Sequence, residues 1–228
     1  MGGGMAGTPQ VSTALLRNVP LLSVLDESEL ALLTSVVTRK SYARGGLILS
    51  AGAPTDSLFI LLAGRIKVFM SDVDGREVIL SILGPGEFFG EMGLIDNSPR
   101  SANVVTLDAC ELICISKRDF KRCLAENFEM AMAVMRGLVK RLRDADNQIG
   151  SLALMDVYGR VARLLLEMAE PVDGEKVVTK KLAKQDIARR IGASREMVSR
   201  VMKHLLSSGY IEVRGDALVI RDNIVLPD

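Results

Sequence analysis

The fold of this 228-residue chain is decided by one stretch near its C-terminus, Gly192-Ala193-Ser194-Arg195-Glu196-Met197-Val198-Ser199-Arg200. A helix predicted to start near Lys184 precedes the glycine turn, and a second, basic helix follows it. This order is that of a helix-turn-helix that reads DNA. Glu196 and Arg200 are four residues apart and share a helical face, with Arg195 beside them. Arginine can grip a guanine edge with two hydrogen bonds, and glutamate can accept one from cytosine.

The surroundings of this motif are basic, although the net charge of the whole chain is only +1. A local basic patch attracts phosphate, whereas the alternative interpretation is an ordinary solvated helical face. Between residues 180 and 203 the basic residues are Lys180, Lys181, Lys184, Arg189, Arg190, Arg195, Arg200 and Lys203. The predicted DNA contacts are Lys184, Gln185, Ser194, Arg195, Glu196, Ser199, Arg200 and Lys203.

Composition narrows the class of protein. The hydrophobic share of 48% supports a sizeable core, and no apolar run reaches the length of a membrane span. The three cysteines do not form a disulfide framework, which fits a reducing cytoplasm. Cys110 and Cys114 fall on one face of a predicted strand, so core burial is expected for both. We predict a flexible tail over residues 1–14, with no signal peptide in it.

The region over residues 15–127 is predicted to form a β domain. Before it, Asp26 and Glu29 have the spacing of a capping box at the start of a helix ending near residue 37. From about residue 42 to residue 116, short apolar runs alternate with glycine-rich turns. Asp74-Gly75 between two such runs is a strong hairpin signal. Many short strands joined in this way predict a β-sandwich or a β-barrel.

A long helix is predicted over residues 128–155. Its apolar positions recur with spacings of three and four, and a single helix cannot bury such a seam by itself. Pairing in a parallel dimer is favoured over packing against the β domain of the same chain. The seam positions are Ala131, Met135, Leu138, Leu142, Ala145, Ile149 and Leu152.

The last region, over residues 156–228, is predicted to be a winged helix-turn-helix. A helix runs from about residue 156 to residue 169 and is broken by Pro171-Val172-Asp173-Gly174. After the reading helix, Gly209 ends the helical pattern, and alternating residues around Gly215-Asp216 predict a β-hairpin.

A second group of polar residues follows the glycine-rich segment Gly86-Glu87-Phe88-Phe89-Gly90-Glu91-Met92-Gly93-Leu94. Gly90 allows a close approach of the backbone to a ligand. Arg100 offers a fixed cationic fork to a phosphate, and Glu91 can accept from a sugar hydroxyl. Together these groups would satisfy one phosphate and one ribose. The predicted ligand contacts are Phe89, Gly90, Glu91, Met92, Arg100, Ser101 and Ala102, joined on the long helix by Leu142 and Asp146.

With these motifs the sequence resembles the cyclic-AMP receptor family of bacterial transcription regulators, the CRP/FNR superfamily. The resemblance runs from about Leu16 to Ile220 and includes a hinge stretch at residues 152–157. It implies an α+β homodimer, each subunit with a cyclic-nucleotide β-roll (jelly roll), a long dimerisation helix and a winged helix-turn-helix. It also implies that Glu91 and Arg100 hold ribose and cyclic phosphate, that the reading helix recognises a TGTGA-type half-site, and that a surface near residues 169–177 meets RNA polymerase.

One departure from the family affects the ligand. Where the cyclic-AMP receptor has Thr-Ser against adenine, this chain has Ala145 and Asp146. A carboxylate can accept from the N1–H and the N2 amine of guanine together, but adenine offers it only one donor group. Cyclic GMP or cyclic di-GMP is therefore favoured by Asp146. The alternative is that Asp146 pairs with Arg143 or with the partner helix, and cyclic AMP then remains a candidate.

Other functions fit the sequence less well. The chain lacks the N-terminal cysteines that an iron–sulfur cluster would need, and its one histidine, His204, lies in the wrong domain for a haem sensor. We expect His204 to pack rather than to contact a phosphate. No metal site and no catalytic group can be assembled, which argues against an enzyme. The remaining alternatives are a regulator with a vestigial pocket, a nucleotide-binding module that acts on a protein partner, and a thiol sensor.

Overall fold

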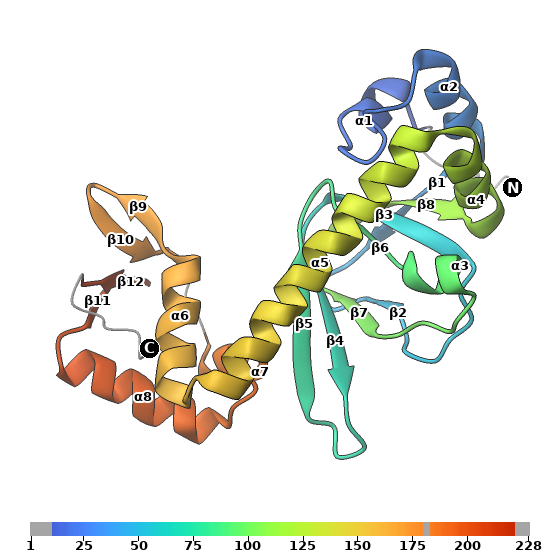
Figure 1. Cartoon of the computed structure of the whole chain (residues 1–228). Coiled ribbons are helices and arrows are strands. Elements are labelled where there is room, and N and C mark those ends of the chain that lie inside the picture. The colour runs from blue at the N-terminus through green and yellow to red at the C-terminus, as the bar shows by residue number, and fades with distance from the viewer. Residues whose placement is uncertain (1–10, 180–182, 222–228) are drawn as a thin grey trace, which may run out of the picture. The chain divides into compact units, whose positions relative to one another are not determined.

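A computed structural model describes residues 11–179 and 183–221 of the chain (Figure 1). It divides into two compact units, Met1–Arg141 and Leu142–Asp228. The first unit contains helices and two β-sheets, and the second contains helices and one β-sheet, so the predicted α+β class is confirmed. Lys180 and Lys181 of the basic patch lie outside the described residues.

The folded part of the chain begins earlier than predicted. A flexible tail was predicted over residues 1–14. Its first ten residues lie outside the described ones, and for residues 11–14 the prediction is wrong. Val11 is buried, and α1 (Thr13–Arg17) begins there because the Ser12 hydroxyl accepts from the Leu15 backbone N–H. The next helix, α2 (Glu27–Val36), carries the predicted capping box at its start.

The β domain of the first unit is built from two four-stranded antiparallel sheets (Figure 1). The hairpin predicted at Asp74-Gly75 joins β4 to β5. In spatial order the first sheet contains β1 (Thr38–Tyr42), β8 (Cys110–Ser116), β3 (Ser57–Ala63) and β6 (Phe88–Phe89). The second contains β2 (Leu47–Leu49), β7 (Asn103–Thr106), β4 (Ile66–Ser71) and β5 (Glu77–Leu83).

Strand β3 has a continuous apolar sequence because both of its faces are buried. Phe59 and Leu61 point to one side and join a cluster with side chains of both sheets. Leu58 and Ile60 point to the other side, into a cluster formed largely by the helices. The first sheet is therefore held between the second sheet and a helical layer made of α1, α2, α4 (Lys117–Glu126) and the start of α5 (Phe128–Leu154).

Helix α5 changes its surroundings along its length. Met130 and Val134 are buried in the helical cluster of the first unit. Farther along, the apolar seam lies at the surface of this single chain, with Leu142 61% exposed and Ile149 63% exposed. The two ends of the helix belong to different units.

The second unit packs three helices against a four-stranded antiparallel sheet. The segment predicted to break the helix after residue 169 does so, since α6 ends at Met168. It also forms the turn of a β-hairpin that was not predicted, in which Asp173 and Gly174 both have positive φ. The elements are α6 (Val157–Met168), β9 (Glu170–Val172), β10 (Glu175–Val178), α7 (Lys184–Ile191), α8 (Arg195–Ser207), β11 (Ile211–Arg214) and β12 (Ala217–Ile220).

Candidate functional site

The glycine-rich loop of the first unit lies between β6 and the short helix α3 (Met92–Asp96). Gly90 adopts φ +83°, and a Cβ there would lie 2.5 Å from Nη1 of Arg100. Glycine is required at this position for two reasons, the left-handed backbone and the close packing of Arg100. Gly90 was predicted to let a ligand approach the backbone closely. In the structure, the group that lies against Gly90 is the guanidinium of Arg100.

Arg100 is held deep in the roll by its neighbours. Its side chain is 3% exposed. Nη1 donates to the Gly90 carbonyl at 2.7 Å, and Nη2 donates to the Ser57 carbonyl at 2.8 Å and to Asp56 Oδ1 at 3.2 Å. Burial lowers the pKa of the guanidinium from its ordinary value, while the Asp56 carboxylate acts in the opposite direction. An arginine pKa is so high that the group stays charged, so Arg100 is a fixed buried cation.

One polar atom of Arg100 has no partner. Its Nε–H is buried and makes no hydrogen bond within the described residues. A buried donor without an acceptor costs about 1–3 kcal/mol. An anionic oxygen is the acceptor that suits a guanidinium best, so this atom marks where an anion would bind.

Glu91 is also buried, at 2% exposure, and is paired with an arginine that the sequence analysis missed. Nη1 of Arg141, on α5, donates to Glu91 Oε1 at 2.6 Å. The same guanidinium donates to the Phe88 carbonyl and lies over the Phe88 ring. Glu91 and Arg141 are 50 residues apart in sequence, so no local spacing could indicate this pair.

The remaining predicted ligand contacts of the loop divide into two groups. Phe89 is buried and stacks on Phe59 with ring centroids 5.3 Å apart, and Ala102 is buried as well. Ser101 and Met92 are exposed, with the Ser101 hydroxyl 3.7 Å from the Met92 sulfur. The structure therefore brings Gly90, Glu91 and Arg100 together, with the Arg100 guanidinium over the Phe59 ring. It leaves Ser101 and Met92 at the surface.

The two predicted ligand contacts on α5, Leu142 and Asp146, belong to the second unit and are both exposed. Within the described residues, Asp146 makes neither an ion pair nor a hydrogen bond with Arg143. The pairing considered as one alternative role for Asp146 is thus not formed within this chain.

The reading helix α8 begins as the sequence predicts. Gly192 ends α7 in the left-handed conformation at φ +63°, and the Ser194 hydroxyl accepts from the Met197 backbone N–H. One face of α8 packs inward through Val198, Met202 and Leu205. The opposite side is exposed and carries Arg195, Glu196, Arg200 and Lys203, whose side chains make no hydrogen bond or ion pair with residues 11–179 or 183–221.

The other predicted DNA contacts are placed differently. Gln185 is exposed on α7. Lys184 and Ser199 are bonded to each other, with Nζ donating to Oγ at 2.9 Å. The ring of His204 meets the Tyr158 ring edge-on at 5.7 Å between centroids, but the residue is otherwise exposed, so its packing role stays a prediction.

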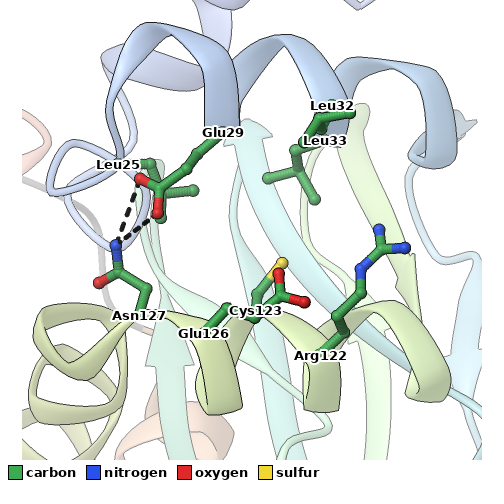
Figure 2. Close-up of a pocket in the computed structure, with 8 residues that line it drawn as sticks. All are labelled: Leu25, Glu29, Leu32, Leu33, Arg122, Cys123, Glu126 and Asn127. Atoms are coloured by element: carbon green, nitrogen blue, oxygen red, sulfur yellow. Dashed lines mark hydrogen bonds between the residues drawn. The ribbon is translucent and has the colours of Figure 1, made fainter.

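A separate pocket lies between α2 and α4, away from the glycine-rich loop (Figure 2). On one side Glu29 accepts two hydrogen bonds from the Asn127 amide, at 3.0 and 3.2 Å. Burial raises the pKa of the Cys123 thiol in this pocket. Such a thiol is poorly ionised at neutral pH, which argues against the thiol-sensor alternative. The lining residues are Leu25, Glu29, Leu32, Leu33, Arg122, Cys123, Glu126 and Asn127.

In the part of the chain that the structure describes, no group of three or more histidine, cysteine, aspartate or glutamate side chains could hold a metal ion. None of the described helices is both long enough and apolar enough to cross a lipid bilayer.

A buried arginine in a β-roll and an exposed basic helix in a helix-turn-helix together define a class of protein, the DNA-binding regulator that responds to a small anionic ligand. The family model of the cyclic nucleotide-binding domain matches residues 39–127, and that of the Crp-like helix-turn-helix domain matches residues 159–225. The chain belongs to the CRP/FNR superfamily of transcription regulators.

Individual relatives span nearly the whole chain. The CRP-like cAMP-activated global transcriptional regulator of Mycobacterium tuberculosis (strain ATCC 25618 / H37Rv) is 30% identical over 213 residues, 92% of this chain and 95% of the relative. The cAMP-activated global transcriptional regulator Vfr of Pseudomonas aeruginosa is 35% identical over 192 residues, 80% and 88% of the two chains. The structure of the c-di-GMP responsive global regulator CLP of Xanthomonas campestris is similar with a TM-score of 0.74 and 28% identity, covering 87% and 100%. This chain is accordingly a CRP-like, cyclic-nucleotide-binding transcription regulator, and its relatives are regulators rather than enzymes.

Proposed function

We propose that this protein is a homodimeric regulator that binds a cyclic purine nucleotide in its β-roll and, in response, binds a palindromic DNA site with TGTGA-type half-sites. The observation that carries the proposal is the buried, unpartnered Nε–H of Arg100. The cyclic phosphate would accept from this atom and be neutralised by the guanidinium. Ribose would lie against Glu91, whose carboxylate keeps an oxygen available beside its bond to Arg141.

The exposed seam of α5 supports the homodimer. Leu142 and Ile149 are large apolar residues that a lone helix leaves in water. Pairing of two such helices, one from each chain, would bury both seams. Two reading helices could then enter successive major grooves roughly 34 Å apart, as a palindrome requires.

The free side chains of α8 support sequence-specific reading. Arg195, Glu196 and Arg200 are exposed and make no side-chain bond to the described residues, so no such bond has to be broken before they meet bases. Two arginines would read guanines and the glutamate would read cytosine, a combination suited to TGTGA and its complement. RNA polymerase would be contacted near residues 169–177, which include β9 and the start of β10.

Two kinds of effector remain candidates, a guanine nucleotide and cyclic AMP, and a different observation supports each. Asp146 lies five residues beyond Arg141 on α5, about 7.5 Å along the helix axis. Its carboxylate would accept from two donors of guanine, in cyclic GMP or cyclic di-GMP. Cyclic AMP is supported by the relatives from M. tuberculosis and P. aeruginosa, which are described as cAMP-activated.

Nucleotide binding would act by shifting a pre-existing equilibrium between two arrangements of the dimer. A ligand shifts such an equilibrium only through different affinities for the two states. The stretch at residues 150–156 contains the end of α5 and the cap of α6, and we propose it as the hinge. A CRP-like regulator that needs no ligand, and a nucleotide-binding module acting on a protein partner, are the alternatives.

Calorimetric titration with cyclic AMP, cyclic GMP and cyclic di-GMP, on the wild type and on Asp146→Ser, tests the proposal. Tight binding of a guanine nucleotide that Asp146→Ser weakens would support reading through Asp146. Tight binding of cyclic AMP that ignores Asp146→Ser would support a cyclic-AMP regulator. Heat from none of the three nucleotides would favour the ligand-independent alternative. Binding of a TGTGA palindrome at several salt concentrations, with a scrambled duplex as control, separates a DNA reader from a module that acts on a protein.

A further inference from the structure

Met92 is an exposed methionine beside the residues proposed to bind the nucleotide. It follows Glu91 directly as the first residue of α3, and it is 54% exposed. The Ser101 hydroxyl donates to its sulfur, with 3.7 Å between Oγ and Sδ. Ser101 in turn comes directly after Arg100 in the sequence. A thioether that solvent can reach is therefore hydrogen-bonded to the neighbour of the buried cation.

Helix α3 is packed tightly against the segment that leads to Ser101. A Cβ at Gly93 would lie 2.2 Å from the Ser98 carbonyl, so the two backbones are already as close as they can be. The next residue of the helix, Leu94, is completely buried at 0% exposure. The contact between Met92 and Ser101 thus rests on a fixed support. A chemical change at the sulfur therefore acts on the hydroxyl rather than displacing the helix.

The hydroxyl of Ser101 has a single hydrogen, so it can serve one acceptor fully at a time. Its present acceptor is a thioether sulfur, which is a weak one. A phosphate oxygen is charged and is a much stronger acceptor. When a nucleotide phosphate binds beside Arg100, the hydroxyl would therefore change partner at little cost. While its sulfur is reduced, Met92 does not compete with the phosphate for this donor.

We propose that Met92 is an oxidation site that controls the nucleotide affinity of the β-roll through Ser101. The oxidant is hydrogen peroxide, which transfers one oxygen atom to the sulfur. The O–O bond breaks, an S–O bond forms, the sulfur loses two electrons and the peroxide is reduced to water. The inference rests on the proposed function, because it requires that a nucleotide phosphate binds beside Arg100.

The sulfoxide changes the competition for the Ser101 hydroxyl. Oxidation turns an apolar side chain into a polar one, and the new oxygen is a strong acceptor held beside the hydroxyl. Its partial negative charge also opposes an anion at the same place. Methionine sulfoxide reductase returns the sulfoxide to the thioether, so the change is reversible. Met92 would thus lower the response to nucleotide under oxidising conditions and restore it afterwards.

The test is calorimetric titration of the full-length protein, reduced and peroxide-treated, with cyclic AMP, cyclic GMP and cyclic di-GMP. Peptide mass spectrometry measures the fraction of Met92 in the sulfoxide form. Dithiothreitol, added before titration, reverses sulfenic acids and disulfides of the cysteines but not sulfoxides. We expect oxidation to weaken binding of the preferred nucleotide about two- to tenfold, as for the loss of one hydrogen bond. Methionine sulfoxide reductase should then restore the affinity.

Four variants, each compared with itself before and after peroxide, assign the effect. Met92→Leu removes the thioether and should abolish the response to peroxide. Ser101→Ala leaves Met92 open to oxidation but should abolish the effect on nucleotide affinity. Met92→Gln places a polar acceptor beside Ser101 and should bind nucleotide more weakly than Met92→Leu without any peroxide.

Met70→Leu is the matched control. Met70 lies on β4, is 52% exposed, and its sulfur accepts no hydrogen bond from the described residues. Its replacement should leave the response to peroxide at the wild-type size. Circular dichroism melts of the reduced and oxidised forms check that both are folded.

Several results would overturn the inference. If Met92→Leu responds to peroxide as the wild type does, or if dithiothreitol alone restores affinity, another residue is responsible. If Ser101→Ala keeps the full response, the effect does not pass through this hydroxyl. A reduced wild type that binds none of the three nucleotides refutes the proposed function, and this inference with it. A reduced wild type that binds a nucleotide with an affinity that Met92 oxidation does not change refutes this inference alone.

Discussion

Arg141 on the long helix and Glu91 in the glycine-rich loop form a buried ion pair with 2.6 Å between Nη1 and Oε1. Glu91 is 2% exposed, whereas the Arg141 side chain is 33% exposed, so the carboxylate is the more deeply buried partner. The pair joins the helix proposed to form the dimer to the loop proposed to bind ribose. The same guanidinium also contacts Phe88, so movement of the helix and movement of the loop are coupled through Arg141.

Replacing Arg141 by alanine should destabilise the protein. The change leaves Glu91 buried without a cation, and removing one partner of a fully buried pair costs about 3–5 kcal/mol, less where one partner is partly exposed as here. We expect a lower melting temperature in scanning calorimetry together with weaker nucleotide binding. Arg143→Ala removes an exposed cation of the same helix and should change little. Equal effects of the two variants would contradict the role given to the pair.

Arg100→Ala should abolish the response to nucleotide and leave basal DNA affinity unchanged. The variant removes the buried cation and the donor that we assign to the phosphate. DNA affinity measured with and without nucleotide by fluorescence anisotropy checks this. Arg65→Ala, which removes a half-exposed arginine paired with Asp108 in the same unit, is the control and should keep the response. A persistent response in Arg100→Ala would place the phosphate elsewhere.

Two glycines of α5 should respond in opposite directions to alanine. A Cβ at Gly137 would lie 2.7 Å from Cζ of Phe88, a buried ring already covered by Arg141. Overpacking of this kind typically costs about 1–3 kcal/mol, more than the ~1 kcal/mol gained in helix propensity.

A Cβ at Gly150, by contrast, meets nothing within 4 Å. Gly150→Ala should therefore stabilise the helix by up to about 1 kcal/mol. The melting temperatures of Gly137→Ala and Gly150→Ala, each compared with the wild type, test both expectations. A stabilising Gly137→Ala would mean that Phe88 has room to move.

Arg195→Ala should cost about 1–3 kcal/mol of affinity on the palindrome and much less on scrambled DNA. The side chain is exposed and has no partner within the described residues, so its loss should not disturb the fold. Electrophoretic mobility shifts on both duplexes measure the ratio, with Arg163→Ala on α6 as a matched loss of charge. If Arg195→Ala keeps the wild-type ratio, the assignment of Arg195 to base reading is wrong.

Cys123 should be alkylated slowly at neutral pH. Burial raises the pKa of its thiol, and only the thiolate reacts with iodoacetamide. As the pH rises past the ordinary thiol value of about 8.5, the unfolded chain ionises first, so this group lowers the stability of the folded state from there upward. Peptide mass spectrometry after timed alkylation, with the urea-unfolded chain as reference, measures the rate. Faster labelling of the folded chain at pH 7 would revive the thiol-sensor alternative.

Much of the architecture was predictable because its signals are local. The capping box of Asp26 and Glu29, the Asp74-Gly75 turn and the glycine turn before α8 each act within a few residues. Asp173-Gly174 carried the same kind of signal as Asp74-Gly75. The hairpin at Asp173-Gly174 was nevertheless not predicted. Pro171 lies beside this turn, and proline is unusual in a strand except at an edge. Strand β9 is such an edge strand of its sheet.

The sequence by itself determined the order of the three regions, the exposed face of α8 that we propose to read DNA, and the residues of the glycine-rich loop, because periodicity and turn chemistry are properties of neighbouring residues. Only the tertiary structure decided that Arg141 is the partner of Glu91, that Gly90 makes room for Arg100, and that Lys184 is bonded to Ser199. Each of these contacts joins elements separated along the chain. A pattern of spacing indicates which face a side chain occupies, but the packing of whole elements determines what that face meets.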